Sequence, residues 1–310
     1  MNALLRQLEF ELDRSSPSRL TSVYIGGGTP STLGPRHYEP LFERFYPLMR
    51  DNTEITIEAN PNSASKEWLE GIKKLGATRI SFGVQSFDDA KLAFLGRAHD
   101  SKEAVAAVEN AATAGFEHIN VDLIYDTAKD TKTLLERDIA AALALPIDHI
   151  SAYALILEDG TPFAHQSAYK KDDDNLGYFV KSLIPFEHYE VSNFGSYRSR
   201  HNIGYWRLEE YIGVGCGAVG FIGGVRRYPQ TDLHAYIRDP LAIDTEPLGP
   251  EELRLEKIFL GLRSIVGVDK ELVDMEKAQI LLDEKRLLLR DGRLYNPNFF
   301  LADELALFLS

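Results

Sequence analysis

Polar and glycine residues gather where short apolar runs of this chain end. A run of β-branched and aromatic residues at 22–25 leads directly into Gly26, Gly27, Gly28 and Thr29. Consecutive glycines leave bare backbone that a small or charged ligand can approach closely. A tight βα connection without a ligand explains the same residues equally well, since a short glycine motif is weak evidence. The segment therefore predicts either a binding loop or a plain turn.

Further side chains with binding chemistry follow the next apolar runs. They lie at or just past the ends of expected strands: Glu58, Asn60, Ser81, Gln85, Arg97, Asn120, Asp122 and Asp126. A carboxylate there can bind ribose hydroxyls, and a guanidinium fork suits a carboxylate or phosphate. Taken singly, each group is explained about as well by hydrogen bonds to loop backbone. Their common placement favours one ligand site, because the active site of a βα barrel lies at the carboxyl ends of its strands.

A histidine stands beside two large aromatic residues in segment 201–206. His201 could ligate a metal or haem iron while Tyr205 and Trp206 stack on a flat macrocycle. A single histidine is more often structural, so composition alone favours a structural role. The nearby run 213–220 contains a formal G-x-G-x-x-G, but the residues after it start a helix poorly. We therefore predict no dinucleotide site there.

Strands and helices that would position these residues alternate along the chain. β-Branched runs predict strands at residues 22–25, 54–59, 79–84, 118–124, 149–154 and 188–193, with apolar residues at helical spacing between them. This pattern favours an α/β fold, a partial (β/α) TIM-like barrel rather than an open sheet. Ser101 and Thr131 stand at expected helix N-caps. Because residues 1–14 predict an amphipathic helix, we expect a barrel lacking its first strand or a sheet with an exposed edge at 22–25.

Prolines and glycines change the character of the chain after Asp232. A linker is predicted from Pro240, Pro247, Gly249 and Pro250. It separates residues 1–240, the barrel with its extension, from residues 241–310, a small helical, winged-helix-like domain. In that domain we expect a helix at 255–262 and, over 287–295, a helix, a tight turn and a strand.

Composition limits the classes of partner. The 310 residues are 44% hydrophobic and 26% charged, as in a globular protein, and the net charge of -13 argues against nucleic acid and anionic membrane surfaces. No apolar run is long enough to cross a bilayer, so the chain is not expected to span a membrane. The single cysteine, Cys216, excludes an intrachain disulfide and indicates a cytoplasmic setting. Its glycine-rich surroundings predict a small buried residue.

Six segments, taken in order, resemble one family. They are residues 24–31, 57–61, 79–87, 95–97, 121–125 and 189–194. They are similar to radical S-adenosylmethionine (SAM) proteins like oxygen-independent coproporphyrinogen III oxidase, and the likeness spans most of the chain. Residues 201–206 resemble the HNxxYW signature of the haem chaperone branch, HemW, of that family. Residues 126–128, Asp-Thr-Ala, depart from the Gly-Leu-Pro common in relatives.

The resemblance implies a partial barrel of the radical SAM type that binds SAM across its open end. Residues Gly26 to Thr29 would meet the methionine amino and carboxylate groups, and Arg97 the carboxylate. Gln85 and Asp122 would lie on the ribose side, and Glu58 would support the same ligand.

The same resemblance implies a haem chaperone in porphyrin and haem metabolism. His201, as a candidate iron ligand, would bind haem or porphyrin together with Tyr205 and Trp206. Haem would then pass to an acceptor protein.

Family members carry a CxxxCxxC motif that holds a [4Fe–4S] cluster, and this chain has no such motif. Cys216 alone cannot hold a cluster, because one needs several thiolates. We therefore expect a chain without the family's N-terminus, through truncation or a misplaced start, or a naturally cluster-free relative, and in either case no reductive cleavage of SAM. Two other functions stay open. One is radical decarboxylation of coproporphyrinogen III propionates, which needs those cysteines, and the other is a cluster-free barrel that acts as a binding scaffold. No catalytic residue is predicted, and whether the chain is an enzyme is left open.

Overall fold

The computed structural model describes residues 1–157 and 166–310, and the chain divides into two compact units. The first unit comprises residues 1–21, 37–53 and 200–310, and the second, here the sheet unit, comprises residues 22–36 and 54–199. The division predicted between residues 240 and 241 stays a prediction.

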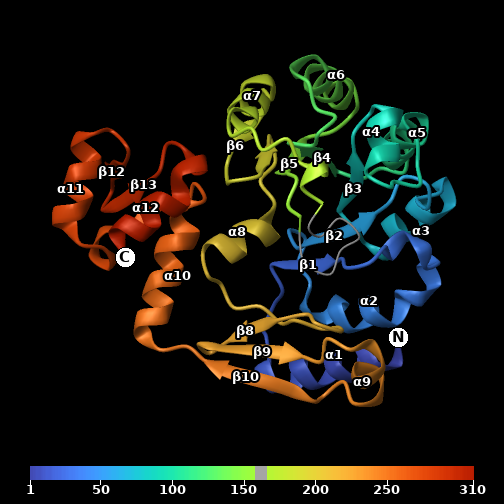
Figure 1. Ribbon diagram of the computed structural model, residues 1–310. Coiled ribbons are helices and arrows are strands. Elements are labelled where there is room, and N and C mark those ends of the chain that lie inside the picture. The colour runs from blue at the N-terminus through green and yellow to red at the C-terminus, as the bar shows by residue number, and fades with distance from the viewer. Residues whose placement is uncertain (158–165) are drawn as a thin grey trace. The chain divides into compact units, whose positions relative to one another are not determined.

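The sheet unit is built on a seven-stranded sheet with the order β1-β2-β3-β4-β5-β7-β6 (Figure 1). Its strands are β1 (Ser22–Ile25), β2 (Glu54–Ala59), β3 (Arg79–Gln85), β4 (His118–Tyr125), β5 (His149–Ala154), β6 (Glu187–His188) and β7 (Asn193–Gly195). Strands β1 to β5 are parallel, which confirms the predicted partial βα barrel. The strand predicted at 188–193 is wrong, because residues 189–192 connect β6 and β7, which pair antiparallel.

Four of the five longer helices of the sheet unit, α3 to α6, begin at residues whose side chains cap them. They are α3 (Lys66–Leu75), α4 (Asp89–Phe94), α5 (Ser101–Thr113), α6 (Lys132–Leu143) and α7 (Asn175–Leu183). The N-cap predicted at Thr131 is confirmed, since its side chain accepts a hydrogen bond from Leu134 N. The one predicted at Ser101 is wrong by one residue: Asp100 caps α5 and forms a capping box with Glu103.

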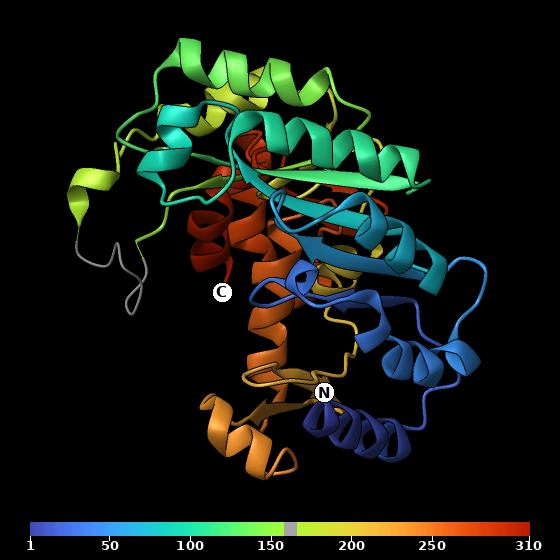
Figure 2. The same ribbon diagram turned by 90° about the vertical axis from the view of Figure 1, so that its right-hand side faces the viewer.

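Alternation of side chains gives the sheet one apolar and one polar face. Helices α3 to α7 lie on the same side of the sheet, as Figures 1 and 2 show, and fully buried apolar residues such as Ile57, Phe82 and Val121 alternate with polar ones along the strands. The opposite side, here called the polar face, carries Tyr24, Glu54, Thr56, Glu58, Arg79, Ser81, Asn120, Asp122, His149, Ser151 and Tyr153. Registered pairs such as Glu58 with Ser81, and Asp122 with Ser151, align these residues across strands.

The first unit contains a second, antiparallel sheet with the order β10-β9-β8. Its elements are α1 (Asn2–Ser15), α2 (Glu39–Phe45), α8 (Arg200–Trp206), β8 (Gly220–Ile222), β9 (Val225–Pro229), α9 (Leu233–Arg238) and β10 (Ile243–Pro247). Two predictions fail here. Part of the predicted linker forms β10, which pairs with β9, and Cys216 is exposed rather than buried. The rejection of a dinucleotide fingerprint at 213–220 holds, since β8, and no helix, follows it.

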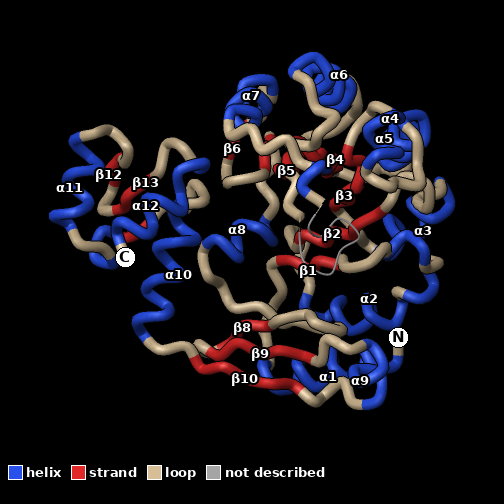
Figure 3. Tube along the Cα trace, in the orientation of Figure 1, coloured by secondary structure: helices blue, strands red, loops and turns tan. Residues whose placement is uncertain are grey.

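Residues 250–310 of the first unit pack around their own apolar core, and Figure 3 shows their helices and short strands. They form α10 (Pro250–Leu262), β11 (Val268–Asp269), α11 (Met275–Asp283), β12 (Leu288–Arg290), β13 (Arg293–Tyr295) and α12 (Ala302–Leu309). The helix predicted at 287–289 is wrong. Asp291 and Gly292, with φ of 50° and 77°, make a two-residue turn, so β12 and β13 form a hairpin. Among the described residues, no helix is both long and apolar enough to cross a bilayer.

Candidate functional site

The glycine loop after β1 is closely packed at Gly26 and open at Gly27 and Gly28. A Cβ atom on Gly26 would lie 2.7 Å from Tyr24 Cε1 and 2.8 Å from Glu58 Cδ, so a larger residue would have to displace these side chains. Gly27 and Gly28 have φ of 78° and 64°, which favours glycine. A Cβ atom on either would meet nothing within 4 Å. The loop is therefore fixed at Gly26 and presents accessible backbone at the next two residues.

Glu58 on β2 ties this loop to the sheet. Its Oε1 accepts a hydrogen bond from Tyr24 Oη at 2.6 Å, and its Oε2 accepts one from Gly27 N at 3.1 Å. Burial raises the pKa of Tyr24, and the neighbouring Glu58 carboxylate raises it further. The phenol therefore remains a donor, and Glu58 positions the glycine loop through both of its oxygens.

Three polar side chains converge on Gly83 near the end of β3. A Cβ atom there would lie 3.0 Å from Gln85 Nε2, 3.1 Å from Arg97 Nη2 and 3.3 Å from Asn60 Oδ1. Gln85 has φ of 70°, and the pairing of β3 with β4 shifts between Phe82 and Gln85. Gln85 follows the alternation of Arg79, Ser81 and Gly83, and the irregularity interrupts the regular pairing of β3 at the cluster.

Arg97 is linked by hydrogen bonds to the glycine loop. Its Nη2 donates to Gly83 O at 3.0 Å and to Asn60 Oδ1 at 3.2 Å, and Asn60 Nδ2 donates to Thr29 Oγ1 at 3.3 Å. Burial lowers the pKa of Arg97, while the charge of Asp122 opposes that shift. Arg97 forms no ion pair with any residue that the structure describes, so its guanidinium retains donors for an anion.

Asp122 on β4 belongs to a hydrogen-bonded network within the polar face. Asn120 Nδ2 donates to its Oδ1 at 2.7 Å, and Asn120 Oδ1 lies 2.5 Å from His149 Nδ1. His149 Nε2 lies 2.7 Å from Tyr189 Oη. Burial raises the pKa of Asp122 to about 6, against the hydrogen bonds from Ser151 and Asn120. The carboxylate is therefore held in place yet partly accessible.

A buried ionic cluster fixes the loops after β3 and β4. Lys91 Nζ lies 2.6 Å from Asp130 Oδ1 and 3.3 Å from Asp138 Oδ2, and Lys91 is fully buried. Ser86 Oγ and Phe87 N, just past Gln85, also donate to Asp138. Sequence reasoning missed these residues, because a lysine and two aspartates in helical or loop segments look solvent-exposed.

The HNxxYW segment forms α8 and belongs to the first unit, whereas the other candidate residues belong to the sheet unit. The rings of His201 and Tyr205 lie 4.6 Å apart, edge to face, and Tyr205 meets Tyr211 at the same distance. Tyr205 is 39% exposed. His201, Tyr205 and Trp206 are thus on one short helix, with an aromatic edge accessible to solvent.

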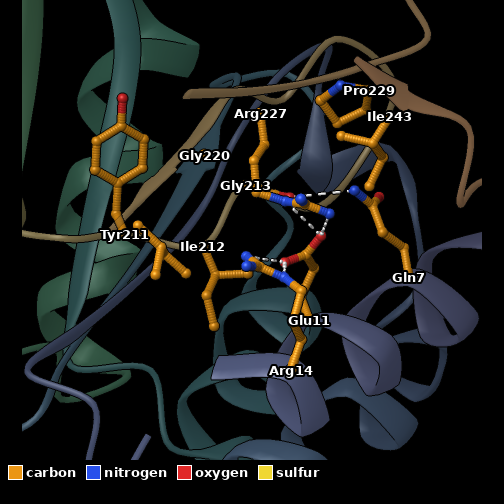
Figure 4. Close-up of a pocket in the computed structure, with 11 residues that line it drawn as sticks. Gln7, Glu11, Arg14, Tyr211, Ile212, Gly213, Gly220, Arg227, Pro229 and Ile243 are labelled. Carbon is orange, nitrogen blue, oxygen red and sulfur yellow. Dashed lines mark hydrogen bonds and ion pairs between the residues drawn. The ribbon is translucent and has the colours of Figure 1, made fainter. Parts of the chain in front are cut away.

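A small pocket in the first unit has a structural role (Figure 4). At its centre Glu11, 2% exposed, accepts hydrogen bonds from Arg14 Nη2 at 2.8 Å and Arg227 Nη2 at 2.9 Å. Gln7 Nε2 donates to Gly213 O at 3.2 Å. Both oxygens of the Glu11 carboxylate are paired, so these residues connect α1 to β9 and do not form a ligand site.

The residues of this chain do not fit an iron–sulfur cluster. Over residues 1–157 and 166–310, no three histidine, cysteine or acidic side chains are grouped to hold a metal ion. Cys216 is exposed and donates to Thr231 O at 3.1 Å. No chemistry that depends on a cluster is therefore derived from these residues.

Comparisons with known proteins agree with the fold. Residues 5–137 match the Radical SAM superfamily. The structure of coproporphyrinogen III oxidase (HemN) from Escherichia coli, a radical SAM enzyme, matches with a TM-score of 0.79 over 99% of this chain and 81% of that one. Sequence identity is 17%, so this match shows the fold alone.

Similarity in sequence is higher to proteins named heme chaperone HemW. The chain is 35% identical to that of Lactococcus lactis subsp. lactis over 285 residues, which are 86% of this chain and 75% of the relative. It is 34% identical to that of Bacillus subtilis over 292 residues, 87% of this chain and 77% of the relative. The chain therefore belongs to the heme chaperone HemW family of radical SAM proteins.

Proposed function

We propose that the protein is a haem chaperone that binds SAM on its sheet unit, binds haem through α8 and passes haem to an acceptor protein. The observation that carries the proposal is the similarity to proteins named heme chaperone HemW over 86% of the chain. Haem delivery is a sequence of binding and release, so it requires no bond cleavage by the residues present.

The loop Gly26 to Thr29 is suited to the methionine end of SAM. Its accessible backbone at Gly27 and Gly28 can meet the amino and carboxylate groups, and Arg97 offers donors to the same carboxylate. Glu58 supports the ligand indirectly, because it holds the loop through Gly27 N.

The ribose side of SAM is assigned to Asp122 and Gln85. With a pKa of about 6, Asp122 is mostly ionised at neutral pH and accepts hydrogen bonds from ribose hydroxyls. Gln85, whose amide lies with the Arg97 guanidinium next to Gly83, offers both a donor and an acceptor. When bound, SAM would supply a sulfonium and an adenosyl group to this edge of the sheet.

Haem is assigned to His201, with Tyr205 and Trp206 as stacking residues. The imidazole can ligate iron through a ring nitrogen, and the exposed edge of Tyr205 offers an apolar flank for a macrocycle. An oxidase activity is not proposed, because the likeness to coproporphyrinogen III oxidase is one of fold. A cytoplasmic setting and the identity of the acceptor stay predictions.

Haem titration followed by the Soret band tests the assignment. We expect His201→Ala with Trp206→Ala to weaken haem uptake by at least about tenfold, with His234→Ala, an exposed histidine of the same unit, as matched control. An unchanged titration for the double variant would reject haem binding through α8.

Calorimetry with SAM tests the sheet unit separately. Asp122→Asn should weaken SAM binding by about tenfold, whereas Asp172→Asn, at a side chain 80% exposed in the same unit, should leave it unchanged. Absence of binding heat with the unaltered chain would instead support the scaffold alternative.

A further inference from the structure

Arg79 is a buried arginine without a partner among the residues that the structure describes. It begins β3, in register with Thr56 of β2 and His118 of β4, and is 2% exposed. Its guanidinium forms no hydrogen bond or ion pair with any residue outside 158–165, and its Nε is completely buried. Neither role assigned above, SAM binding or haem binding, uses this side chain.

The charge of Arg79 acts on the middle of the polar face. Burial raises the pKa of Asp122 to about 6, and the charge of Arg79 is among the influences that oppose this. Burial likewise raises the pKa of Tyr153 and of Tyr189, again with Arg79 opposing. The carboxylates of this face bond to other groups: Asp122 to Asn120, and Glu58 to Tyr24 and Gly27. Among the described residues, none of these carboxylates pairs with the Arg79 guanidinium.

The guanidinium of Arg79 stays charged although it is buried, because arginine does not lose its proton in proteins. A buried charge is normally paired or ligand-bound, because leaving water without compensation is costly. Two acceptors of the sheet unit are also unsatisfied among the described residues: Glu190 Oε1 and Asn193 Oδ1 are buried without partners, and Asn193 is in register with Ser151 of the polar face. These unpaired donors and acceptors indicate that a polar group from outside the described residues binds to them.

We infer that Arg79 binds a carboxylate of a ligand that enters the polar face. The planar fork of arginine matches the two oxygens of a carboxylate. Access is available on this face, since Tyr153 is 41% exposed and Asp122 is partly accessible. The ligand proposed for this unit, SAM, carries one carboxylate, at its methionine end, and the second test decides whether Arg79 or Arg97 binds it.

The first test measures thermal unfolding in acetate and in chloride at equal pH and ionic strength. Acetate should raise the unfolding temperature of the unaltered chain by about 2 to 4 °C, and the shift should be absent in Arg79→Met. In chloride, Arg79→Met should unfold at or above the temperature of the unaltered chain, because it removes an unpaired buried charge. Arg36→Met, at an exposed arginine of the same unit, is the matched control and should keep the acetate shift.

An equal acetate shift in Arg79→Met would overturn the inference. The inference would also fail if Arg79→Met were much less stable in chloride and acetate had no effect on the unaltered chain. Arg79 would then be a structural residue that binds only water.

The second test identifies the source of the carboxylate. Loss of SAM affinity in Arg79→Met assigns it to the methionine end. An acetate shift that depends on Arg79, with SAM affinity unchanged, assigns the site to another carboxylate. If the variant keeps both the acetate shift and the SAM affinity of the unaltered chain, the inference fails, whereas the proposed function, tested through His201 and Asp122, would still stand.

Discussion

Replacement of Lys91 by methionine should destabilise the sheet unit more than any loss of a surface ion pair. Lys91 is fully buried, with Asp130 Oδ1 at 2.6 Å and Asp138 Oδ2 at 3.3 Å. Methionine keeps the length of the side chain but leaves two buried carboxylates without a cation. Removing one partner of a buried ion pair costs about 3–5 kcal/mol. Because Ser86 and Phe87 bond to Asp138, we also expect weaker SAM binding through the adjacent Gln85.

Urea denaturation checks this magnitude. For a unit of this size, such a loss lowers the unfolding temperature by about 6 to 20 °C and shifts the urea midpoint without changing the m value. Lys73→Met is the matched control: its ion pair with Glu117 spans 3.4 Å and is partly exposed, so it should cost about 0–1 kcal/mol. Adding Asp130→Asn and Asp138→Asn to Lys91→Met should recover stability, because it removes the two unpaired buried carboxylates. If Lys91→Met proved no more harmful than the control, the cluster would not stabilise these loops.

Three further substitutions have defined outcomes. Gly26→Ala places a Cβ atom 2.7 Å from Tyr24 Cε1, so it should displace the Tyr24–Glu58 pair and weaken SAM binding in calorimetry; unchanged affinity would mean that the loop adapts. Burial raises the pKa of Glu190 from 4.5 to about 7, so the native state retains a proton that the unfolded state loses, and stability should fall as pH rises through this window. Glu190→Gln should remove that slope and gain about 3 kcal/mol above pH 7, measured by urea denaturation at several pH values; a persisting slope would assign the dependence to another group. Gly292→Ala, at φ of 77°, should cost about 1 kcal/mol, read from the thermal unfolding of the chain; no loss would show that the hairpin turn tolerates a side chain.

The parallel part of the sheet could be predicted because its signal is local. Strands β2 to β5 alternate apolar and polar residues, and each apolar set packs under helices of matching period. Two segments could not be read this way. Three consecutive leucines at 287–289 fit a helix or a strand, and only pairing with β13 decides for a strand. Residues 188–193 look continuous, but the turn at 189–192 reverses the chain between β6 and β7.

The residues of the candidate site also differ in whether the local sequence reveals them. Residues such as Gln85 and Asp122 could be found because polar groups at strand ends stand out against apolar runs. Arg79 and Lys91 could not, since a charged residue at the start of a strand or on a short helix ordinarily faces solvent. Their burial depends on elements far apart in the sequence, as in the contact of Lys91 with Asp138. Cross-strand register, which the sequence alone does not supply, is what places Arg79 in the polar face.

The hydrogen-bonding state of the polar face indicates what kind of group it receives. Its carboxylates are largely satisfied within the protein: Glu58 by Tyr24 and the glycine loop, and Asp122 by Asn120. Arg79 of this face and Arg97, which is linked to the glycine loop, form no ion pair with any residue in the described part of the chain. In a chain with a net charge of -13, these two guanidiniums are therefore the groups that remain to bind an anion. Because a guanidinium matches the two oxygens of one carboxylate, Arg97 and Arg79 offer two positions for an anionic group, one linked to the glycine loop and one at the start of β3.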